Sequence, residues 1–282
     1  MMKYLLCFSF IFLFTSCATN NEVPVKSVED KKADIYYGHG TDMLIQKDYT
    51  TALMHLQNAE KFRPDDTKIL NNLGMAYYFK KDIENAIKYL KKAIDEDSKN
   101  SDARNNLASV YVNQGRLGEA LEQYKRILNN LVYQHQYRTH YNMALVYQSK
   151  GDIDRAILEL QKSVKINAEY CPAYYQLGVI STKQRQYKKS LDFFKKSTLG
   201  TCVNNPAPHY QQAISLLELN LHQQALIKLK EIIEQFPTSR YSILATRKLR
   251  VIEIERLKSR RTKMSKNTKS RNKKRTETKV SF

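Results

Sequence analysis

Apolar and small side chains recur along most of the chain at helical spacing, and the pattern itself repeats about every 34 residues. Between residues 67 and 100, two runs with apolar positions three, four and seven residues apart flank a short polar turn, which predicts two amphipathic helices. A small residue of the second run returns at intervals of 34, 34, 36, 34 and 35 residues, at Ala52, Ala86, Ala120, Ala156, Ser190 and Ala225. One such unit cannot bury both of its faces alone, so the period predicts a stack of helical hairpins.

The period divides the chain into six units, at residues 33–66, 67–100, 101–136, 137–170, 171–205 and 206–239. In most first helices a small residue, such as Gly74 or Gly178, leaves room for close contact with the second helix. In unit one, Gly38 and Gly40 lower the helix propensity of the first helix. After the last unit, an apolar stripe predicts a capping helix at 240–257.

This pattern resembles the tetratricopeptide repeat family across about residues 33–237. The resemblance implies an all-α fold, a right-handed α-solenoid of about six helix-turn-helix repeats plus a C-terminal capping helix. It also implies that the first helices of the repeats line a concave face, on which members of the family bind other polypeptides.

Polar and aromatic side chains recur on the predicted concave face. Amides occupy the sixth position of five consecutive first helices: Asn72, Asn106, Asn142, Gln176 and Gln211. Tyrosines occupy the preceding position in four units: Tyr37, Tyr141, Tyr175 and Tyr210. An amide offers a donor and an acceptor to an extended peptide, and a tyrosine offers flat, rigid contact area. We therefore predict a peptide- or protein-binding groove; the alternative is that the amides bond only locally and are structural.

The N-terminus has the features of an export signal. Lys3 precedes an apolar run over residues 4–15, which is shorter than the roughly 20 residues that span a bilayer and suits a signal-peptide core. Residues 14–17 resemble a bacterial lipobox, which implies lipidation of Cys17 with palmitate, cleavage after residue 16 and anchorage at the periplasmic side of the outer membrane. Ordinary secretory cleavage near Ala18 is the alternative. The polar stretch 18–32 is predicted to be a flexible tether.

Two cysteines remain in the predicted helical part, Cys171 at the start of the first helix of unit five and Cys202 just after its second helix. Because the two helices run antiparallel, both cysteines lie at the same end of the hairpin. A disulfide is therefore predicted, and an oxidising periplasm would permit it. Two independent, partly buried thiols are the alternative.

The formal net charge of +19 is concentrated at the C-terminus, where residues 258–282 carry eleven Lys or Arg and one acidic residue. The near absence of apolar residues there predicts a disordered tail. It has three possible roles: none that is specific, attachment to anionic lipid headgroups or cell-wall polymer, or nucleic-acid binding. Because an exported chain seldom meets nucleic acid, we expect no nucleic-acid partner.

Catalytic signals are weak in this sequence. The six histidines show no metal-ligand spacing, and no Cys-x-x-Cys pair is present, so we predict no enzyme activity, no metal site and no cofactor. The lipobox, the six repeats and the longer third repeat together resemble the type IV pilus biogenesis and stability lipoproteins, or pilotins. That resemblance implies a scaffold that binds a segment of the outer-membrane secretin. Two alternatives are a scaffold that positions a peptidoglycan-active enzyme and a hydrolase with its site in the groove.

Overall fold

The computed structural model describes residues 26–279, and the predicted signal peptide, Cys17 and most of the predicted tether lie outside that range. Thirteen α-helices and one short 3₁₀ helix make up the described part, which contains no strand. The helices are α1 (Val28–Ile45), α2 (Tyr49–Phe62), α3 (Thr67–Phe79), α4 (Ile83–Glu96), α5 (Ser101–Asn113), α6 (Leu117–Leu128), α7 (Gln136–Ser149), α8 (Ile153–Ile166), α9 (Cys171–Lys183), α10 (Tyr187–Lys196), η1 (Gly200–Cys202), α11 (Pro206–Glu218), α12 (His222–Gln235) and α13 (Arg240–Lys279).

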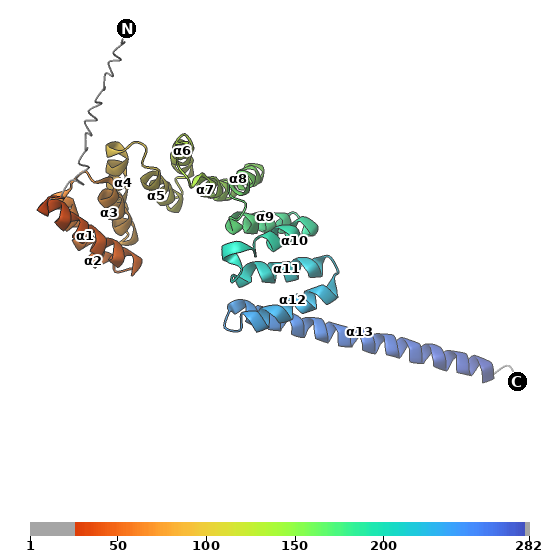
Figure 1. Ribbon diagram of the computed structural model, residues 1–282. Helices are drawn as coiled ribbons and strands as arrows, with labels where there is room; N and C mark the ends of the chain where they lie inside the picture. The colour runs from red at the N-terminus through yellow and green to blue at the C-terminus, as the bar shows by residue number, and fades with distance from the viewer. Residues whose placement is uncertain (1–25, 280–282) are drawn as a thin grey trace, which may run out of the picture.

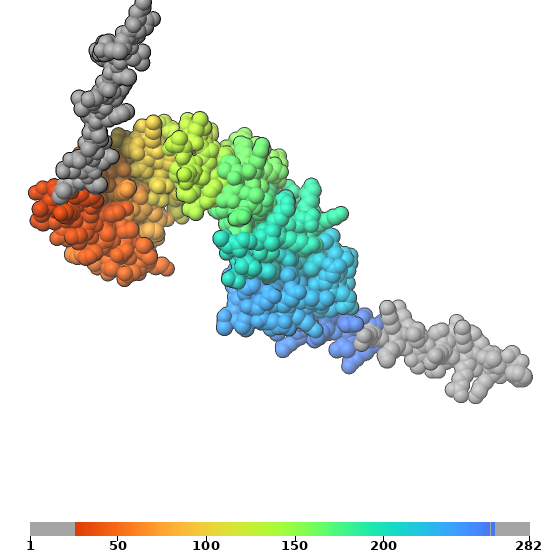
Figure 2. All heavy atoms as spheres, in the orientation of Figure 1, coloured from red at the N-terminus to blue at the C-terminus, as the bar shows by residue number. Residues whose placement is uncertain are grey.

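The helices form six antiparallel hairpins, α1/α2 to α11/α12, each packed on the next (Figure 1). The stack curves as an arch, with the N-terminal hairpins on one side and the C-terminal hairpins on the other (Figure 2). The core follows the stack as well, because the largest cluster of buried apolar residues runs from α3 to α9 and smaller clusters lie at both ends. The predicted all-α solenoid is confirmed.

Each hairpin turn uses the same backbone device. One residue just after the first helix has a positive φ, which ends the helix and turns the chain: Lys47, Lys81, Gly115, Gly151, Arg185 and Asn220. In the first, second and fourth hairpins an aspartate (Asp48, Asp82 or Asp152) follows directly and caps the second helix, as where Asp82 accepts from the backbone N–H of Asn85 at 3.1 Å. Because all six hairpins turn in this way, they share one backbone geometry and differ mainly in their side chains.

Close contact within three hairpins requires glycine. A Cβ added at Gly74 would lie 2.6 Å from Cγ of Leu90, and one at Gly178 would lie 2.6 Å from the ring of the buried Phe194. Gly40 meets Leu56 in the same way. Gly40 is therefore the small contact residue of the first hairpin, which sequence reasoning had read only as a cost to helix propensity.

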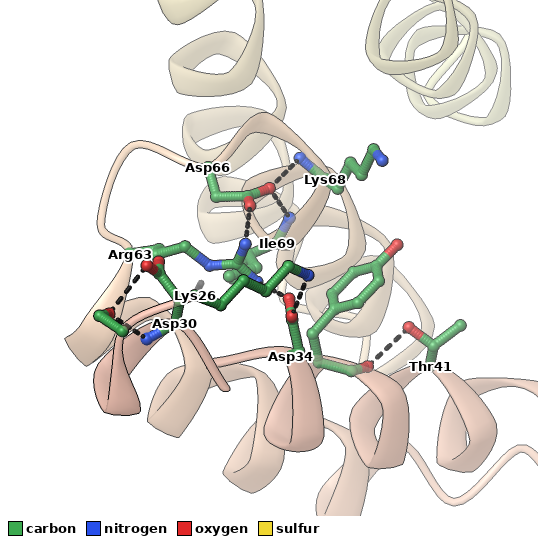
Figure 3. A network of polar contacts seen from close by, with 10 residues as sticks. Lys26, Asp30, Asp34, Thr41, Arg63, Asp66, Lys68 and Ile69 are labelled. Carbon is green, nitrogen blue, oxygen red and sulfur yellow. Dashed lines mark hydrogen bonds and ion pairs between the residues drawn. The ribbon is translucent and has the colours of Figure 1, made fainter. Parts of the chain in front are cut away.

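The first helix begins earlier than predicted, at Val28 inside the predicted tether 18–32. Ser27 caps α1 by accepting from the backbone N–H of Asp30 at 2.9 Å, and acidic residues in the first turn favour the helix start. Asp34 of α1 then accepts from Lys26 and from Arg63 of the α2–α3 turn, both at 2.6 Å (Figure 3). Hydrogen bonds from these two cations lower the pKa of Asp34. The end of the tether is thus part of the first repeat.

The last helix differs from the sequence prediction too, because α13 continues as helix to Lys279, past the predicted boundary at 257 and into the predicted disordered tail 258–282. Lysine and arginine are good helix formers, and the sequence has neither Gly nor Pro after Pro237, so nothing stops the helix. The N-terminal part of α13 packs on α12 and α11, with Ala245 buried and Tyr241 beside Tyr210, and caps the stack. Beyond that, α13 projects away from the hairpins (Figure 1).

A disulfide closes the fifth hairpin. It joins Cys171 at the start of α9 to Cys202 in η1, with their Cα atoms 6.3 Å apart. This bond ties the two ends of the hairpin together.

Among the helices of the described range, none combines the length and the apolar character needed to cross a bilayer.

Candidate functional site: a trough on the inner face

The inner face of the solenoid is the surface formed by the first helices, α1, α3, α5, α7, α9 and α11. First helices of neighbouring hairpins approach one another directly, as α1 does with α3 and α3 with α5. Direct approach on one side of the stack places the first helices on the inside of the curve. The side chains predicted for the groove all belong to these helices.

Two pockets lie side by side on the inner face and together form a trough across repeats three to five. One pocket, of about 190 Å³, lies between α5 and α7, and the other, of about 470 Å³, lies between α7 and α9. They share Leu145 and Ser149 of α7. Besides these two, the trough is lined by Ser109, Val112, Asn113, Tyr124, Asn142, Val146, Gln148, Ile153, Gln176, Val179, Ile180, Lys183 and Gln184.

Of the nine residues predicted for the groove, the structure brings Asn142 and Gln176 together in this trough. The apolar floor beside them comes from Leu145 and Val179, which sequence reasoning missed. A signal for the floor exists in the sequence, because each of these residues follows the amide of its own helix by three positions and so lies on the same helical face. An apolar floor beside polar amides is a surface that can hold an apolar side chain and bond the peptide backbone next to it.

The amides of the N-terminal half connect neighbouring repeats. The side-chain nitrogen of Asn72 donates to Thr41 of α1 at 2.9 Å. In the same way Asn106 donates to Asn71 at 2.8 Å and Asn142 donates to Asn105 at 3.0 Å. We call these three bonds the amide ladder. They link α1 to α3, α3 to α5 and α5 to α7, so the amides bond between repeats, and the acceptor role of Asn71 and Asn105 was missed by sequence reasoning.

The predicted tyrosines are half-buried and pack against other side chains of the solenoid. Tyr141 packs against Tyr170 with ring centroids 5.5 Å apart, and Tyr210 packs against Tyr241 at 5.7 Å. Tyr175 lies 5.6 Å from the ring of Phe194, and Tyr37 packs on the core of the first two hairpins.

Gln176 and Gln211, the two glutamines of the predicted groove, each lie beside a tyrosine of the preceding repeat. Burial raises the pKa of Tyr141, and a side-chain hydrogen bond with Gln176 partly opposes the rise. Tyr175 has the same relation to Gln211 of the next repeat, with burial again as the larger cause. In the C-terminal half, a tyrosine of one repeat thus lies beside a glutamine of the next.

The buried ionisable groups lie inside the hairpins rather than in the trough. His140 of α7 places Nδ1 2.6 Å from Oε2 of Glu159 in α8, and Lys162 lies 2.8 Å from the other oxygen. Burial alone would raise the pKa of Glu159, but the hydrogen bonds from His140 and Lys162 hold it below its ordinary value. Within residues 26–279 no group of three or more His, Cys, Asp or Glu side chains is placed to hold a metal ion.

Comparison with models of known families identifies the type of repeat. Four models of the tetratricopeptide repeat match residues 37–101, 80–139, 137–170 and 209–239, which together cover more than half of the chain. The chain belongs to the tetratricopeptide repeat family. The matched stretches lie on the first four hairpins and on the sixth.

Two curated relatives of this tetratricopeptide protein differ in size. The chain is 24% identical over 202 residues to anaphase-promoting complex subunit 3 of Schizosaccharomyces pombe, covering 65% of this chain and 29% of that protein. It is also 24% identical over 182 residues to an uncharacterized protein of Haemophilus influenzae, covering 62% of this chain and 97% of that protein. The chain thus spans less than a third of the yeast relative and nearly all of the bacterial one.

Two solved structures share the tetratricopeptide fold over their whole length. PilF of Pseudomonas aeruginosa superposes with a TM-score of 0.64 and 17% identity, covering 81% of this chain and 100% of PilF. PilW, described as a widely conserved type IV pilus biogenesis factor, gives a TM-score of 0.63 and 17% identity, covering 81% of this chain and 99% of PilW. The arrangement of repeats in these proteins is therefore the arrangement found here.

Proposed function

We propose that this tetratricopeptide repeat protein is a non-enzymatic scaffold in the periplasm that binds an extended segment of another protein in its inner trough. The observation that carries the proposal is the trough itself, where Asn142 and Gln176 stand beside the floor of Leu145 and Val179. Backbone groups of an extended segment need donors and acceptors, and its side chains need an apolar surface. The trough offers both across three repeats.

The partner we propose is a segment of the outer-membrane secretin of a type IV pilus. Support comes from the two superposed structures, since PilW is described as a type IV pilus biogenesis factor and the chain covers nearly all of it. At 17% identity the likeness concerns the fold, so the partner has to be tested on this chain.

Outer-membrane anchorage through Cys17 is part of the same proposal. Its support is the lipobox-like stretch 14–17 and the disulfide Cys171–Cys202, because disulfides persist in oxidising compartments such as the periplasm. A lipid anchor would carry the bound secretin segment to the membrane in which the secretin assembles. Fractionation of cells that express the wild type and the Cys17→Ser variant tests this step, and equal recovery of both in the outer membrane would contradict it.

The binding step is tested in cells that lack the protein, through the amount of assembled secretin multimer. We expect wild type to restore multimers and the double variant Leu145→Glu/Val179→Glu to fail, because two carboxylates would stand on the apolar floor. Leu158→Glu is the matched control, since Leu158 is an exposed leucine of the second helix α8 that is 49% exposed and lies outside the trough. Multimers that form normally with the double variant would exclude the trough as the secretin site.

A second candidate function is favoured by the projecting part of α13. Eleven basic residues with one acidic residue between 258 and 282 suit an anionic envelope polymer, so the scaffold could position a peptidoglycan-active enzyme. Truncation after Leu257 separates the two functions. If this candidate is correct, truncation abolishes binding to isolated cell wall and leaves secretin multimers intact; if the secretin function is the only one, truncation changes neither.

A further inference from the structure

Repeat three carries a cationic pocket away from the trough, between the α4–α5 turn and the insertion loop 129–135. The pocket has a volume of about 400 Å³ and is lined by Ser98, Lys99, Ser101, Arg104, Arg126, Asn129, Asn130, Leu131 and Val132. Three of these nine residues are cationic and none is acidic. A neighbouring pocket of about 370 Å³ shares Ser98, Arg104 and Arg126, so Arg104 and Arg126 can be reached from both.

Arg104 is a buried cation that forms no close ion pair within the described chain, although Asp95 and Asp97 lie near enough for their charges to act on it. Its side chain is 9% exposed, and its acceptors are neutral: Nε and Nη2 donate to the Ser98 carbonyl at 3.3 and 3.0 Å, and Nη1 donates to Gln123 at 3.1 Å. These bonds use three of the five N–H groups of a guanidinium and leave one on each Nη. Burial is the main cause that lowers the pKa of Arg104, the charge of Arg126 lowers it further, and the charges of Asp95 and Asp97 oppose the shift only in part. A bound anion would relieve both effects.

In the next repeat, the basic side chain at the position of Arg104 has a carboxylate partner within its own hairpin. His140 stands in repeat four where Arg104 stands in repeat three, 36 residues earlier, and Glu159 corresponds in the same way to Gln123. In repeat four the carboxylate of Glu159 accepts from His140 at 2.6 Å. In repeat three the amide of Gln123 replaces that carboxylate, so Arg104 has no carboxylate partner at this position.

Two residues of the pocket lining, Leu131 and Val132, form an apolar pair on a loop that hydrogen bonds hold in place. Leu131 and Val132 are 87% and 83% exposed, the largest values among the described large hydrophobic residues. The loop that carries them is held on both sides, because Asn130 donates to the carbonyl of Lys99 at 3.2 Å and Tyr133 donates to Asp102 at 3.2 Å. Exposed apolar side chains on an ordered loop are typical of an interaction site.

We propose that this pocket and the Leu131–Val132 pair form a second docking site, for a protein segment in which an Asp or Glu carboxylate stands beside a large apolar side chain. The carboxylate accepts from the remaining N–H groups of Arg104 and from Arg126, and the apolar side chain packs on Leu131 and Val132. Arginine suits this role because its planar fork matches a carboxylate.

The charges around the pocket favour a protein segment over an anionic surface. Glu122 pairs with Arg126 at 2.8 Å, and Asp95 lines the neighbouring pocket. These carboxylates would repel a lipid surface or a polyphosphate that spreads over the face, whereas a single carboxylate can enter between them. A free phosphate ion would also leave the apolar pair without a role.

The test is a selection of displayed random short peptides on the full-length protein, followed by counter-selection on the triple variant Arg126→Gln/Leu131→Ser/Val132→Ser. We expect the surviving peptides to share an acidic residue next to a large apolar one. Replacing that acidic residue with its amide should weaken binding by about tenfold, as expected for a lost charge-assisted hydrogen bond. Survivors without an acidic residue, or no survivors, would overturn the proposal.

Two single variants isolate the charge. Gln123→Glu supplies an internal carboxylate to Arg104 and should weaken a selected peptide by about tenfold while the protein stays folded. Lys125→Gln is the matched control, because it removes a charge from an exposed position of α6 outside the pocket and should leave binding unchanged. Unchanged binding to Gln123→Glu, or equal losses in both variants, would contradict the proposal.

Two further controls test whether the pocket binds other anions and whether the peptide binds in the trough instead. Inorganic phosphate and phosphatidylglycerol vesicles are titrated against wild type and Arg126→Gln, and binding that depends on Arg126 without any peptide binding would assign the pocket to phosphate instead. The trough variant Leu145→Glu/Val179→Glu should bind the selected peptide as wild type does. Loss of peptide binding in that variant would place the peptide in the trough and overturn the second site.

Discussion

Repeats three and four share one backbone plan and bury a basic side chain at the same point of the first helix, Arg104 and His140. In repeat four, Glu159 and Lys162 complete the charges inside the hairpin. In repeat three, Gln123 takes the place of Glu159, and the insertion loop raises Leu131 and Val132 beside the pocket. The hairpin with Glu159 balances its own basic side chain, whereas the hairpin with Gln123 can receive a carboxylate from a partner. In an array of equal hairpins, specific contacts are therefore expected where one repeat departs from its neighbours.

Removal of the internal carboxylate should have the largest effect on this comparison. Glu159→Ala leaves His140 and the amine of Lys162 without their acceptor, so we expect a loss of about 3 kcal/mol in the free energy of unfolding. The corresponding change in repeat three, Gln123→Ala, removes a neutral acceptor and should cost about 1 kcal/mol. Urea denaturation of both variants measures the difference. Equal losses would mean that the two repeats hold their cations in the same way.

Low pH should also destabilise repeat four, by a smaller amount than the Glu159→Ala substitution. The pKa of Glu159 is held below its ordinary value of 4.5, so its contribution is complete above that value and is lost as the pH falls through the lowered pKa. Other carboxylates titrate in the same range, so the quantity to measure is the difference between wild type and Glu159→Gln in urea denaturation at several pH values. We expect the difference to shrink as the pH falls below about 4.5. A difference that stays constant would contradict the role given to Glu159.

Gln123→Glu should make repeat three resemble repeat four. The new carboxylate would stand near Nη1 of Arg104, where Gln123 now accepts at 3.1 Å, and we expect a gain of about 1 kcal/mol in stability. Urea denaturation at neutral pH measures it. If the variant is less stable than wild type, Arg104 already has its charge compensated, and the contrast between the repeats fails.

The smallest effect is expected from the insertion loop of repeat three. Asn130→Ala removes the bonds to Lys99 and Ser101, which should cost about 0.5 kcal/mol and loosen the support of Leu131 and Val132. Asn129→Ala is the control, because it removes an exposed neighbouring amide and leaves the bonds from Asn130 to Lys99 and Ser101 in place. Hydrogen exchange of residues 129–135 should increase in the first variant and stay as in wild type in the second.

The fold could be predicted from the sequence because the period of small residues repeats six times. Because the same pattern occurs six times, even a position with an unusual residue could be assigned: Ser190 takes the place of the alanine found in the other repeats, and it is buried as predicted. The ends are different because they occur once. The cap at Ser27 depends on one Ser and one Asp, and the length of α13 depends on the absence of a stop signal, which composition alone read as disorder.

The candidate site could be predicted only in part, because a helical period gives the face of a residue and not its partner. Asn142 and Gln176 were placed on the inner face, and both line the trough. That Asn106 donates to Asn71 depends on the distance between neighbouring repeats, which the sequence does not contain. The tyrosines were predicted as contact area for a partner, whereas in the structure Tyr141 packs on Tyr170 of its own repeat and Tyr210 packs on Tyr241 of α13.

The central claim, that the inner trough binds another polypeptide, is tested most directly by photo-crosslinking from single positions of the full-length protein in the cell envelope. A photoreactive residue at 145 or 179 faces the trough, and one at 158 is exposed on a second helix. We expect a discrete crosslinked protein from 145 and 179 and none from 158. The same adduct from 158, or no adduct from the two trough positions while the partner is present, would contradict it.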